Sequence, residues 1–293
     1  MVQSLTISLT HWTQNSRSNG DFATLKFPNL RELNISGPPP PDIVPMLQSL
    51  LSQPSLQKIT FFCAHLPALL PTLLVGRSRG IATLILRPAS SPYNRDRLSS
   101  IETIDDQLSR PVVVDHLVLR DFPSCDIDRL SCSIALGKLR TLSCSLTNDS
   151  ASIRNILELS SKSLSSLHIL DIWPGCRASE DLWFPRMPRL VELVVHRIDC
   201  HTAPVLSEFL FALSHASGVR KVVLKCGRTS MQQDRSGYWK MVDDHLAHSF
   251  SLSSVLLEIP VGCAGLDGSW SASEISARLP LLEKKGILSV GMI

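Results

Sequence analysis

The fold is decided by a short stretch that recurs along the chain, Leu30-Arg31-Glu32-Leu33-Asn34-Ile35. Its apolar residues stand at the first, fourth and sixth positions, and the positions between them are polar. Alternation of apolar and polar residues is typical of a strand with one buried face. The stretch therefore predicts a short strand whose buried face carries Leu33 and Ile35.

This pattern occurs eleven times. Copies begin 25 to 33 residues apart, about 28 on average, at Val2, Leu30, Leu56, Ile81, Val114, Leu139, Leu164, Leu190, Val219, Leu252 and Lys285. A fixed internal period of this length indicates a repeat protein, in which each copy is one structural unit. The 46 leucines of the 293-residue chain are concentrated at these positions and on the faces described next.

The segments between the predicted strands carry the period of a helix. In the clearest one, Thr202 is a candidate cap and Pro204 suits a first turn, and an apolar face follows with Val205, Leu206, Phe209, Leu210 and Leu213. Similar faces are Ile43, Met46, Leu47, Leu50 and Leu51; Ile127, Leu130 and Ile134; and Ile153, Ile156 and Leu157. Stacked strand-helix units bury a shared core. We therefore predict an α/β solenoid, a horseshoe with a curved parallel sheet inside and helices outside, as a single domain of about eleven units over residues 1–293.

Three segments resemble a known family. They are two strand lead-ins, Phe27–Leu33 and Met187–Leu193, and the closing segment Leu279–Leu288. With them the chain resembles leucine-rich-repeat proteins of the ribonuclease-inhibitor-like type, particularly the repeat region of F-box-like proteins of mushroom-forming (basidiomycete) fungi. The resemblance covers essentially the whole chain. It implies the substrate-recognition part of an F-box-type ubiquitin-ligase adaptor. No F-box segment is seen, so we expect the ligase scaffold to be reached through an additional N-terminal segment.

One family feature is missing from the sequence. Leucine-rich repeats usually place an Asn or Cys three residues after the last core position of the strand, where it bonds the neighbouring coil. The corresponding residues here are Pro38, Ala64, Ala89, Phe122, Thr147, Ile172, Ile198, Gly227 and Pro260. We therefore expect this side-chain ladder to be weak or absent.

The candidate binding residues lie between and just after the two core positions of each strand, where they face the concave side. The set combines apolar and basic side chains, which fits a protein-binding surface with an apolar centre and basic anchors. Burial of the same residues by loops or neighbouring side chains is an equally open interpretation. The candidates are Ile85, Arg87, Val118, Arg120, His168, Val194, His196, Val223, Lys225 and Leu256.

Motifs of catalysis and of metal binding are missing from the sequence. It contains no GxSxG, GxxxxGK[ST], GxGxxG or HExxH, so we expect neither an enzyme nor a cofactor. His245 and His248 are spaced for one helical turn, but without a third ligand they are interpreted as part of a solvated helix face, and no metal is expected. Cys144 occupies a core position of its strand and is predicted to be a small buried hydrophobe.

Charge and cysteine usage narrow the partners and the compartment. The net charge of +3 comes from scattered Lys and Arg, which argues against a nucleic-acid partner. The most apolar window, residues 61–75, is interrupted by His65, Pro67 and Pro71, so no membrane segment is expected, and the first residues do not form a signal peptide. Eight cysteines without a CxxC pair favour the reducing cytoplasm or nucleus.

A second interpretation stays open, that of a divergent or incomplete structural repeat array without a specific partner. The first strand at Leu5 and the last at Leu288 lie within a few residues of the two ends of the sequence. End repeats normally need a polar cover. Exposed end strands would therefore favour this alternative.

Overall fold

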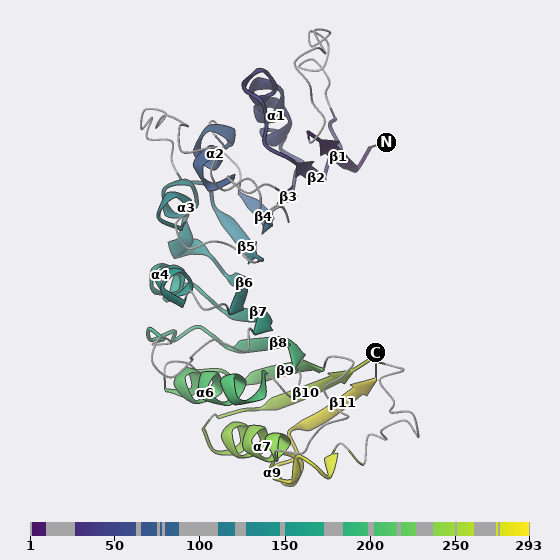
Figure 1. Ribbon diagram of the computed structural model, residues 1–293, viewed down its shortest axis with the longest axis vertical. Helices are drawn as coiled ribbons and strands as arrows, with labels where there is room; N and C mark the ends of the chain where they lie inside the picture. Colours follow the sequence, from purple (N-terminus) through teal and green to yellow (C-terminus); the bar gives the residue numbers. More distant parts are fainter. Residues whose placement is uncertain are drawn as a thin grey trace. The chain divides into compact units, whose positions relative to one another are not determined.

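The computed structural model describes most of the chain as strands and helices in alternation (Figure 1). The described residues are 2–9, 27–62, 66–74, 77, 80–87, 111–120, 127–146, 150–172, 184–198, 202–215, 218–226, 237–249, 251–260, 274 and 276–292. They belong to two compact units, Met1–Leu136 and Gly137–Ile293. Both units are of the α/β class.

The first unit contains five parallel strands that pair in chain order. They are β1 (Ser4–Ser8), β2 (Glu32–Ser36), β3 (Lys58–Phe62), β4 (Ile81–Arg87) and β5 (Val114–Leu119). The connections carry η2 (Pro41–Ile43), which leads into α1 (Val44–Leu51), and then α2 (Leu66–Leu73) and α3 (Ile127–Ser133). α2 packs against both α1 and α3.

The second unit repeats this arrangement with six parallel strands. They are β6 (Thr141–Leu146), β7 (Ser166–Ile172), β8 (Glu192–Ile198), β9 (Lys221–Cys226), β10 (Ser254–Ile259) and β11 (Leu288–Met292). A 3₁₀ turn, η5 (Leu136–Lys138), precedes β6, and the helices are α4 (Ser150–Ser160), α6 (Ala203–Ser214), α7 (Tyr238–Ser249) and α9 (Pro280–Lys284). In each unit the helices lie on one face of the sheet (Figure 1). The opposite face, which we call the helix-free face, carries the remaining strand side chains.

All eleven predicted strands are confirmed, and the repeated leucine positions explain why they align. Equivalent apolar residues are direct register partners on adjacent strands, and in the interior strands they are completely buried. Full burial of one such side chain stabilises the fold by roughly 1.5 to 3 kcal/mol. The two columns are Leu33, Ile59, Leu84 and Leu117 in the first unit, and Leu142, Leu167, Leu193, Val222 and Val255 in the second.

The predicted helical faces are confirmed where their side chains are described, except that Met46 is only half-buried. The side chain of Ile127 lies outside the described residues. In α6, Leu206, Phe209, Leu210 and Leu213 are completely buried and Val205 is 8% exposed. Pro204 lies in the first turn, as predicted. The prediction for Thr202 was wrong in one respect, because this residue takes the N-cap position without a side-chain capping bond. Its backbone carbonyl instead accepts the first helical hydrogen bond, from the Leu206 amide at 2.9 Å.

Successive repeats are joined by backbone carbonyls where each strand begins. The amides of Gln57 and Lys58 share the Arg31 carbonyl at 2.9 Å each, and the amides of Val191 and Glu192 share that of Ser165. Serine hydroxyls add bonds to the preceding repeat in three places, Ser55 to the Leu30 carbonyl, Ser165 to that of Arg140 and Ser253 to that of Arg220. These three serines thus have a structural role at the strand entries.

A buried carboxylate fastens the last helix to its neighbour. Asp243 on α7 is only 2% exposed. Its two oxygens accept hydrogen bonds from the amides of Leu281 and Leu282, at 2.8 and 3.0 Å, in the first turn of α9. Lys285, just beyond α9, donates to the Ala247 carbonyl near the end of α7. Two polar clamps therefore join these helices across some 38 residues of chain.

We predict that Asp243→Ala lowers the free energy of unfolding by about 2 to 3 kcal/mol, because it leaves two amides of α9 without an acceptor. Urea denaturation followed by circular dichroism measures the change. Asp244→Ala is the matched control: this neighbour is exposed, so its replacement should stay within about 0.5 kcal/mol. Equal losses for the two variants would contradict the clamp.

Candidate functional site

The candidate surface is the helix-free face of each sheet, where the strands place one side chain per repeat in register. In the first unit the central column contains Thr60, Ile85 and Val118. In the second it contains Ser143, His168, Val194, Val223 and Leu256. The structure thus brings the predicted candidates together as columns within each unit. Arg87, Arg120, His196 and Lys225 occupy positions two residues further along their strands or just beyond them.

Much of the central column is packed and does not face solvent. Val118, Val194 and Val223 are 9%, 6% and 5% exposed, whereas Ile85 and Leu256 are half-buried. Neighbouring strands lie only about 4.8 Å apart, so side chains in one column cover one another. Of the apolar candidate residues, Ile85 and Leu256 are therefore the two that remain partly open to a partner.

A polar network surrounds Glu192 at the entry of β8. The Glu192 carboxylate accepts hydrogen bonds from Lys221 Nζ at 2.7 Å and from Ser166 Oγ at 2.9 Å, and His168 Nε2 lies 3.0 Å from the same hydroxyl. The bond from Lys221 is the main reason why the pKa of Glu192 lies below its ordinary value; the bond from Ser166 acts in the same direction. Within this network the charge of Glu192 is compensated by Lys221, so no ligand is needed to balance it.

Two histidines lie side by side next to this network. The rings of His168 and His196 are 6.2 Å apart between centroids. Burial, followed by the nearby charges of His196 and Lys225, lowers the pKa of His168, and these effects outweigh the attraction of Glu192. Lys225 itself is paired with Glu258 at 2.9 Å. It is therefore neutralised within the sheet, unlike the open basic anchor that the sequence suggested.

The position of His196 depends on a bulge that the sequence did not reveal. The register between β8 and β9 shifts between Val195 and Ile198, and Arg197 has a positive φ of 53°. Arg197 also pairs with Asp171 of β7 at 3.4 Å. A bulge inserts an extra residue and redirects the side chains around it. The sequence has no glycine or asparagine at the bulge, so it gave no indication of the positive φ at Arg197.

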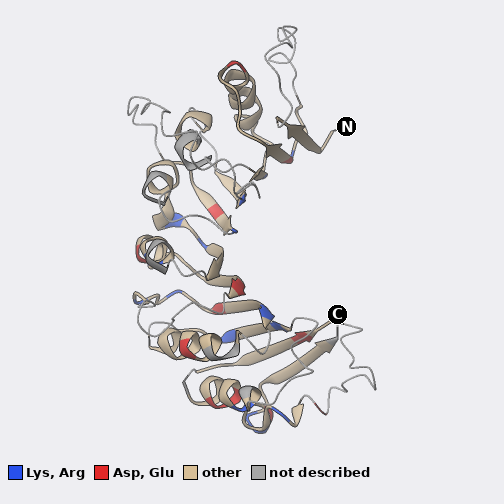
Figure 2. Cartoon of the chain, in the orientation of Figure 1, with Lys and Arg blue, Asp and Glu red and all other residues tan. Residues whose placement is uncertain are grey.

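The first unit holds an arginine pair of a different kind. Arg87 is the last residue of β4 and Arg120 follows β5, one step beyond the register pair Leu86 and Leu119. Figure 2 shows basic residues at the ends of these two strands. Burial and then the charge of Arg120 lower the pKa of Arg87. The Arg87 guanidinium lies over the Phe62 ring, 5.4 Å from its centroid.

Neither arginine is neutralised within the described part of the chain. No ion pair joins Arg87 or Arg120 to a described carboxylate. The Nε atoms of both side chains are buried and have no hydrogen-bond acceptor. An unmet buried N–H group is costly, so the two arginines form the least satisfied polar site among the candidates.

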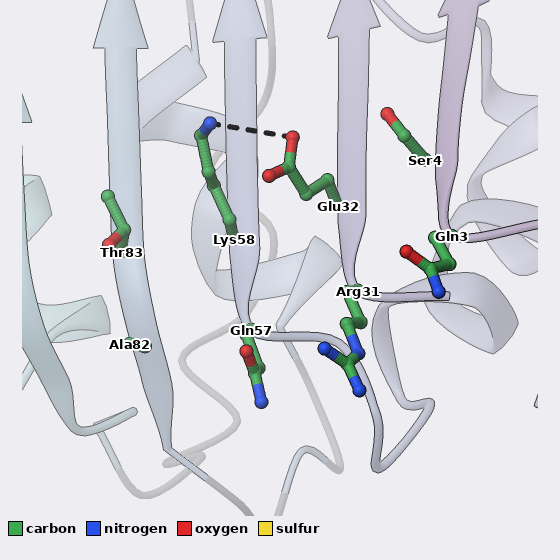
Figure 3. A pocket seen from close by; sticks show the side chains of 8 residues that line it. All are labelled: Gln3, Ser4, Arg31, Glu32, Gln57, Lys58, Ala82 and Thr83. Atoms are coloured by element: carbon green, nitrogen blue, oxygen red, sulfur yellow. Dashed lines mark hydrogen bonds and ion pairs between the residues drawn. The ribbon is translucent and has the colours of Figure 1, made fainter. Parts of the chain in front are cut away.

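A pocket lies at the other end of the first unit's strands, where β1 to β4 begin (Figure 3). Its volume is about 530 Å³, and one ion pair crosses it, from Lys58 Nζ to Glu32 at 3.4 Å. The full lining is Gln3, Ser4, Arg31, Glu32, Gln57, Lys58, Ala82 and Thr83. The set lacks a histidine or cysteine to act as base or nucleophile. Sequence reasoning missed this pocket, although its residues recur at one repeat position, the strand entry.

The residues considered for metal binding do not converge. Asp243 is bound to α9, the Nδ1 atom of His248 lies 2.9 Å from the Asp244 carbonyl, and His245 packs near the Phe211 ring. Within the described ranges, no group of three His, Cys, Asp or Glu residues is placed to hold a metal ion.

Cys144 is a core residue, as predicted. It is 1% exposed, and burial raises the pKa of its thiol to about 12. The reactive form of cysteine is the thiolate. This residue is therefore not a nucleophile at neutral pH.

Comparison with known proteins found no match, neither to a protein-family model nor to a curated protein or a solved structure. The likeness to F-box-type leucine-rich-repeat proteins therefore rests on the sequence pattern and stays a prediction. A separate structural finding concerns membranes: the described segments include no helix with the length and apolar character needed to span a bilayer.

We predict that His168 makes stability depend on pH between 7 and 5. Its pKa in the folded chain lies below the ordinary value of 6.5, so the unfolded chain binds the proton first as the pH falls, and stability decreases. His168→Gln should reduce the loss of urea stability between pH 7 and pH 5. Measurements kept above pH 5 avoid titrating Glu192, whose ordinary value is 4.5.

The control for this experiment is His248→Gln, which replaces an exposed histidine on α7. It should keep the pH dependence of the natural chain. An unchanged pH dependence in His168→Gln would show that this histidine is not the group responsible.

Proposed function

We propose that the chain is a non-catalytic protein-recognition module, a leucine-rich-repeat horseshoe that holds a partner protein against its concave, helix-free face. The observation that carries the proposal is the arginine pair at the ends of β4 and β5. Two basic side chains stand together there without an internal counter-ion among the described residues. Half-buried Ile85 adds apolar surface beside them. Charged anchors beside apolar surface are typical of recognition sites.

The resemblance of the sequence extends this proposal to a pathway role. We propose the substrate-recognition part of an F-box-type ubiquitin-ligase adaptor, which reaches the ligase scaffold through a further N-terminal segment and works in the cytoplasm or nucleus. The lead-ins Phe27–Leu33 and Met187–Leu193 support it. In both, a proline stands second in a turn closed by a backbone bond, from Leu30 to Phe27 at 2.9 Å and from Leu190 to Met187 at 3.1 Å.

A structural repeat array without a specific partner is the second candidate. The observation in its favour is the first strand, in which Leu5 and Ile7 are only half-buried and are preceded by Val2 at 46% exposure. An uncovered end strand is a site for unspecific association. This candidate predicts an isolated chain that aggregates and enriches no protein above background.

The proposed function predicts that partner capture depends on the helix-free face. The full chain is used as bait in affinity purification, and captured proteins are quantified by mass spectrometry. Ile85→Glu and Leu256→Glu, made singly, should reduce the main captured proteins about tenfold or more, because each places a charge on the remaining open apolar surface. Circular dichroism checks that both variants stay folded.

The matched control is Leu159→Glu on α4, a leucine that is 53% exposed on the helical side. It should capture the same proteins as the natural chain. Full capture by both face variants would contradict recognition through this face. If ligase scaffold subunits never co-purify with a bait that includes the upstream coding sequence, the adaptor role is to be abandoned.

A further inference from the structure

We infer that Arg87 and Arg120 form a binding site for the carboxylates of an acidic peptide segment in the partner protein. The inference rests on the proposed function and deepens it, because it assigns a chemical class to the partner. It uses only the first unit of the chain. The site consists of the two guanidinium groups, the Phe62 ring that supports one of them, and the neighbouring Ile85.

The strand register places these groups in one row. Phe62 of β3 is the direct register partner of Arg87 in β4, and Arg120 comes next, one residue beyond Leu119, the partner of Leu86. The Arg120 amide donates to the Leu86 carbonyl at 3.2 Å, so the backbone of both arginines is fixed by the sheet. Cation–π contact with Phe62 then holds the Arg87 guanidinium over the ring. The site is therefore built on rigid elements.

Four other Lys and Arg side chains of the two helix-free faces have a counter-ion, in contrast to this pair. Each of four cations is paired with an acidic residue on an adjacent strand, at distances from 2.7 to 3.4 Å. The pairs are Lys58 with Glu32, Lys221 with Glu192, Lys225 with Glu258 and Arg197 with Asp171. Arg87 has another cation as its neighbour instead. The sheet thus supplies a counter-ion to these four cations, whereas no described carboxylate is paired with either arginine of the pair.

The pair is unfavourable for the isolated chain. Two like charges on adjacent strands repel each other, and this repulsion contributes to the lowered pKa of Arg87. The buried Nε groups gain no hydrogen bond in return. A group that costs stability without serving the fold is a candidate for ligand binding. An anion placed between the two guanidinium groups would remove the repulsion.

The chemistry of the site favours carboxylates on a peptide. The planar guanidinium presents paired N–H donors that match the two oxygens of a carboxylate. Half-buried Ile85, two residues before Arg87 on the same face, offers an apolar contact at the spacing of side chains along an extended chain. A nucleic acid would need a broader basic surface, whereas the chain carries only +3 net charge with its cations scattered. The expected ligand is an extended segment with Glu or Asp near an apolar residue.

The test measures binding of fluorescein-labelled dodecapeptides to the full chain by fluorescence anisotropy at low salt. One series carries two Glu residues at varied spacing beside a Leu, a second carries Gln at the same places, and a third carries phosphoserine. A twelve-nucleotide poly-dT is the nucleic-acid probe. We expect the best Glu peptide to bind about tenfold or more tighter than its Gln twin and than poly-dT, and at least as tightly as its phosphoserine twin.

The arginines are tested by Arg87→Gln and Arg120→Gln, each of which should remove most of the preference for Glu over Gln. Arg31→Gln is the matched control, because Arg31 is an exposed arginine of the same unit at the opposite end of the strands. It should leave the preference unchanged. Equal binding of Glu and Gln peptides, tighter binding of phosphoserine peptides, or tighter binding of poly-dT would overturn the assignment.

Thermal melting separates a ligand site from a structural one. Since neither arginine has an internal counter-ion among the described residues, each Gln variant should melt within about 2 °C of the natural chain or above it. Citrate, a tricarboxylate, should raise the melting temperature of the natural chain more than NaCl of equal ionic strength, and it should not do so for the variants. A melting temperature lowered by more than about 5 °C in both variants would show a structural role and overturn the inference.

The outcomes for this site and for the proposed function can be told apart. If partner capture still depends on Ile85 and Leu256 while Glu and Gln peptides bind alike, the carboxylate site is wrong and the recognition face stands. If capture is independent of the face and no peptide binds, both are wrong.

Discussion

The structure depends on the burial of equivalent leucine, isoleucine and valine side chains in register between parallel strands. Leu33, Ile59, Leu84 and Leu117 form such a column in the first unit, and Leu142 to Val255 form its counterpart in the second. A single strand-helix repeat could not cover its apolar face alone, because its strand and its helix each leave one side open. The column therefore determines the register of the strands and the side of the sheet on which the helices pack.

The same register determines what stands on the helix-free face. If equivalent core residues are partners, then so are the residues between them, and polar side chains of successive repeats meet across about 4.8 Å. Most cations there meet an acidic neighbour, as Lys221 meets Glu192. Arg87 and Arg120 differ, because each has another cation as its neighbour and no described acidic partner. The proposed recognition site consists of these two residues. Sites that violate a local rule without structural benefit are where function is expected.

The sequence predicted the elements well because both periods are local properties. The eleven strands, the helical face of α6 and the buried Cys144 all followed from spacing alone. The burial of Val118, Val194 and Val223 was left open as one of two interpretations, because it depends on side chains of other repeats. The capping of α9 by Asp243 and the bulge at Arg197 were also missed, since the first joins residues 38 apart and the second has no marker residue. Likewise, the sequence showed that the Asn residues of the usual side-chain ladder are missing. It did not show the hydrogen bonds to backbone carbonyls, from amides and serine hydroxyls, that join the repeats at the strand entries.

The central claim, in-register pairing of equivalent repeat positions, is tested most directly by disulfide trapping in a chain whose natural cysteines are replaced. Glu32→Cys with Lys58→Cys, and Glu192→Cys with Lys221→Cys, join direct register partners whose side chains already touch. Each pair should form a disulfide on mild oxidation, seen by non-reducing peptide mapping, because parallel neighbours lie within bridging range. Glu32→Cys with Thr60→Cys, two residues out of register, should not. Failure of both in-register pairs, or efficient trapping of the out-of-register pair, would contradict the account.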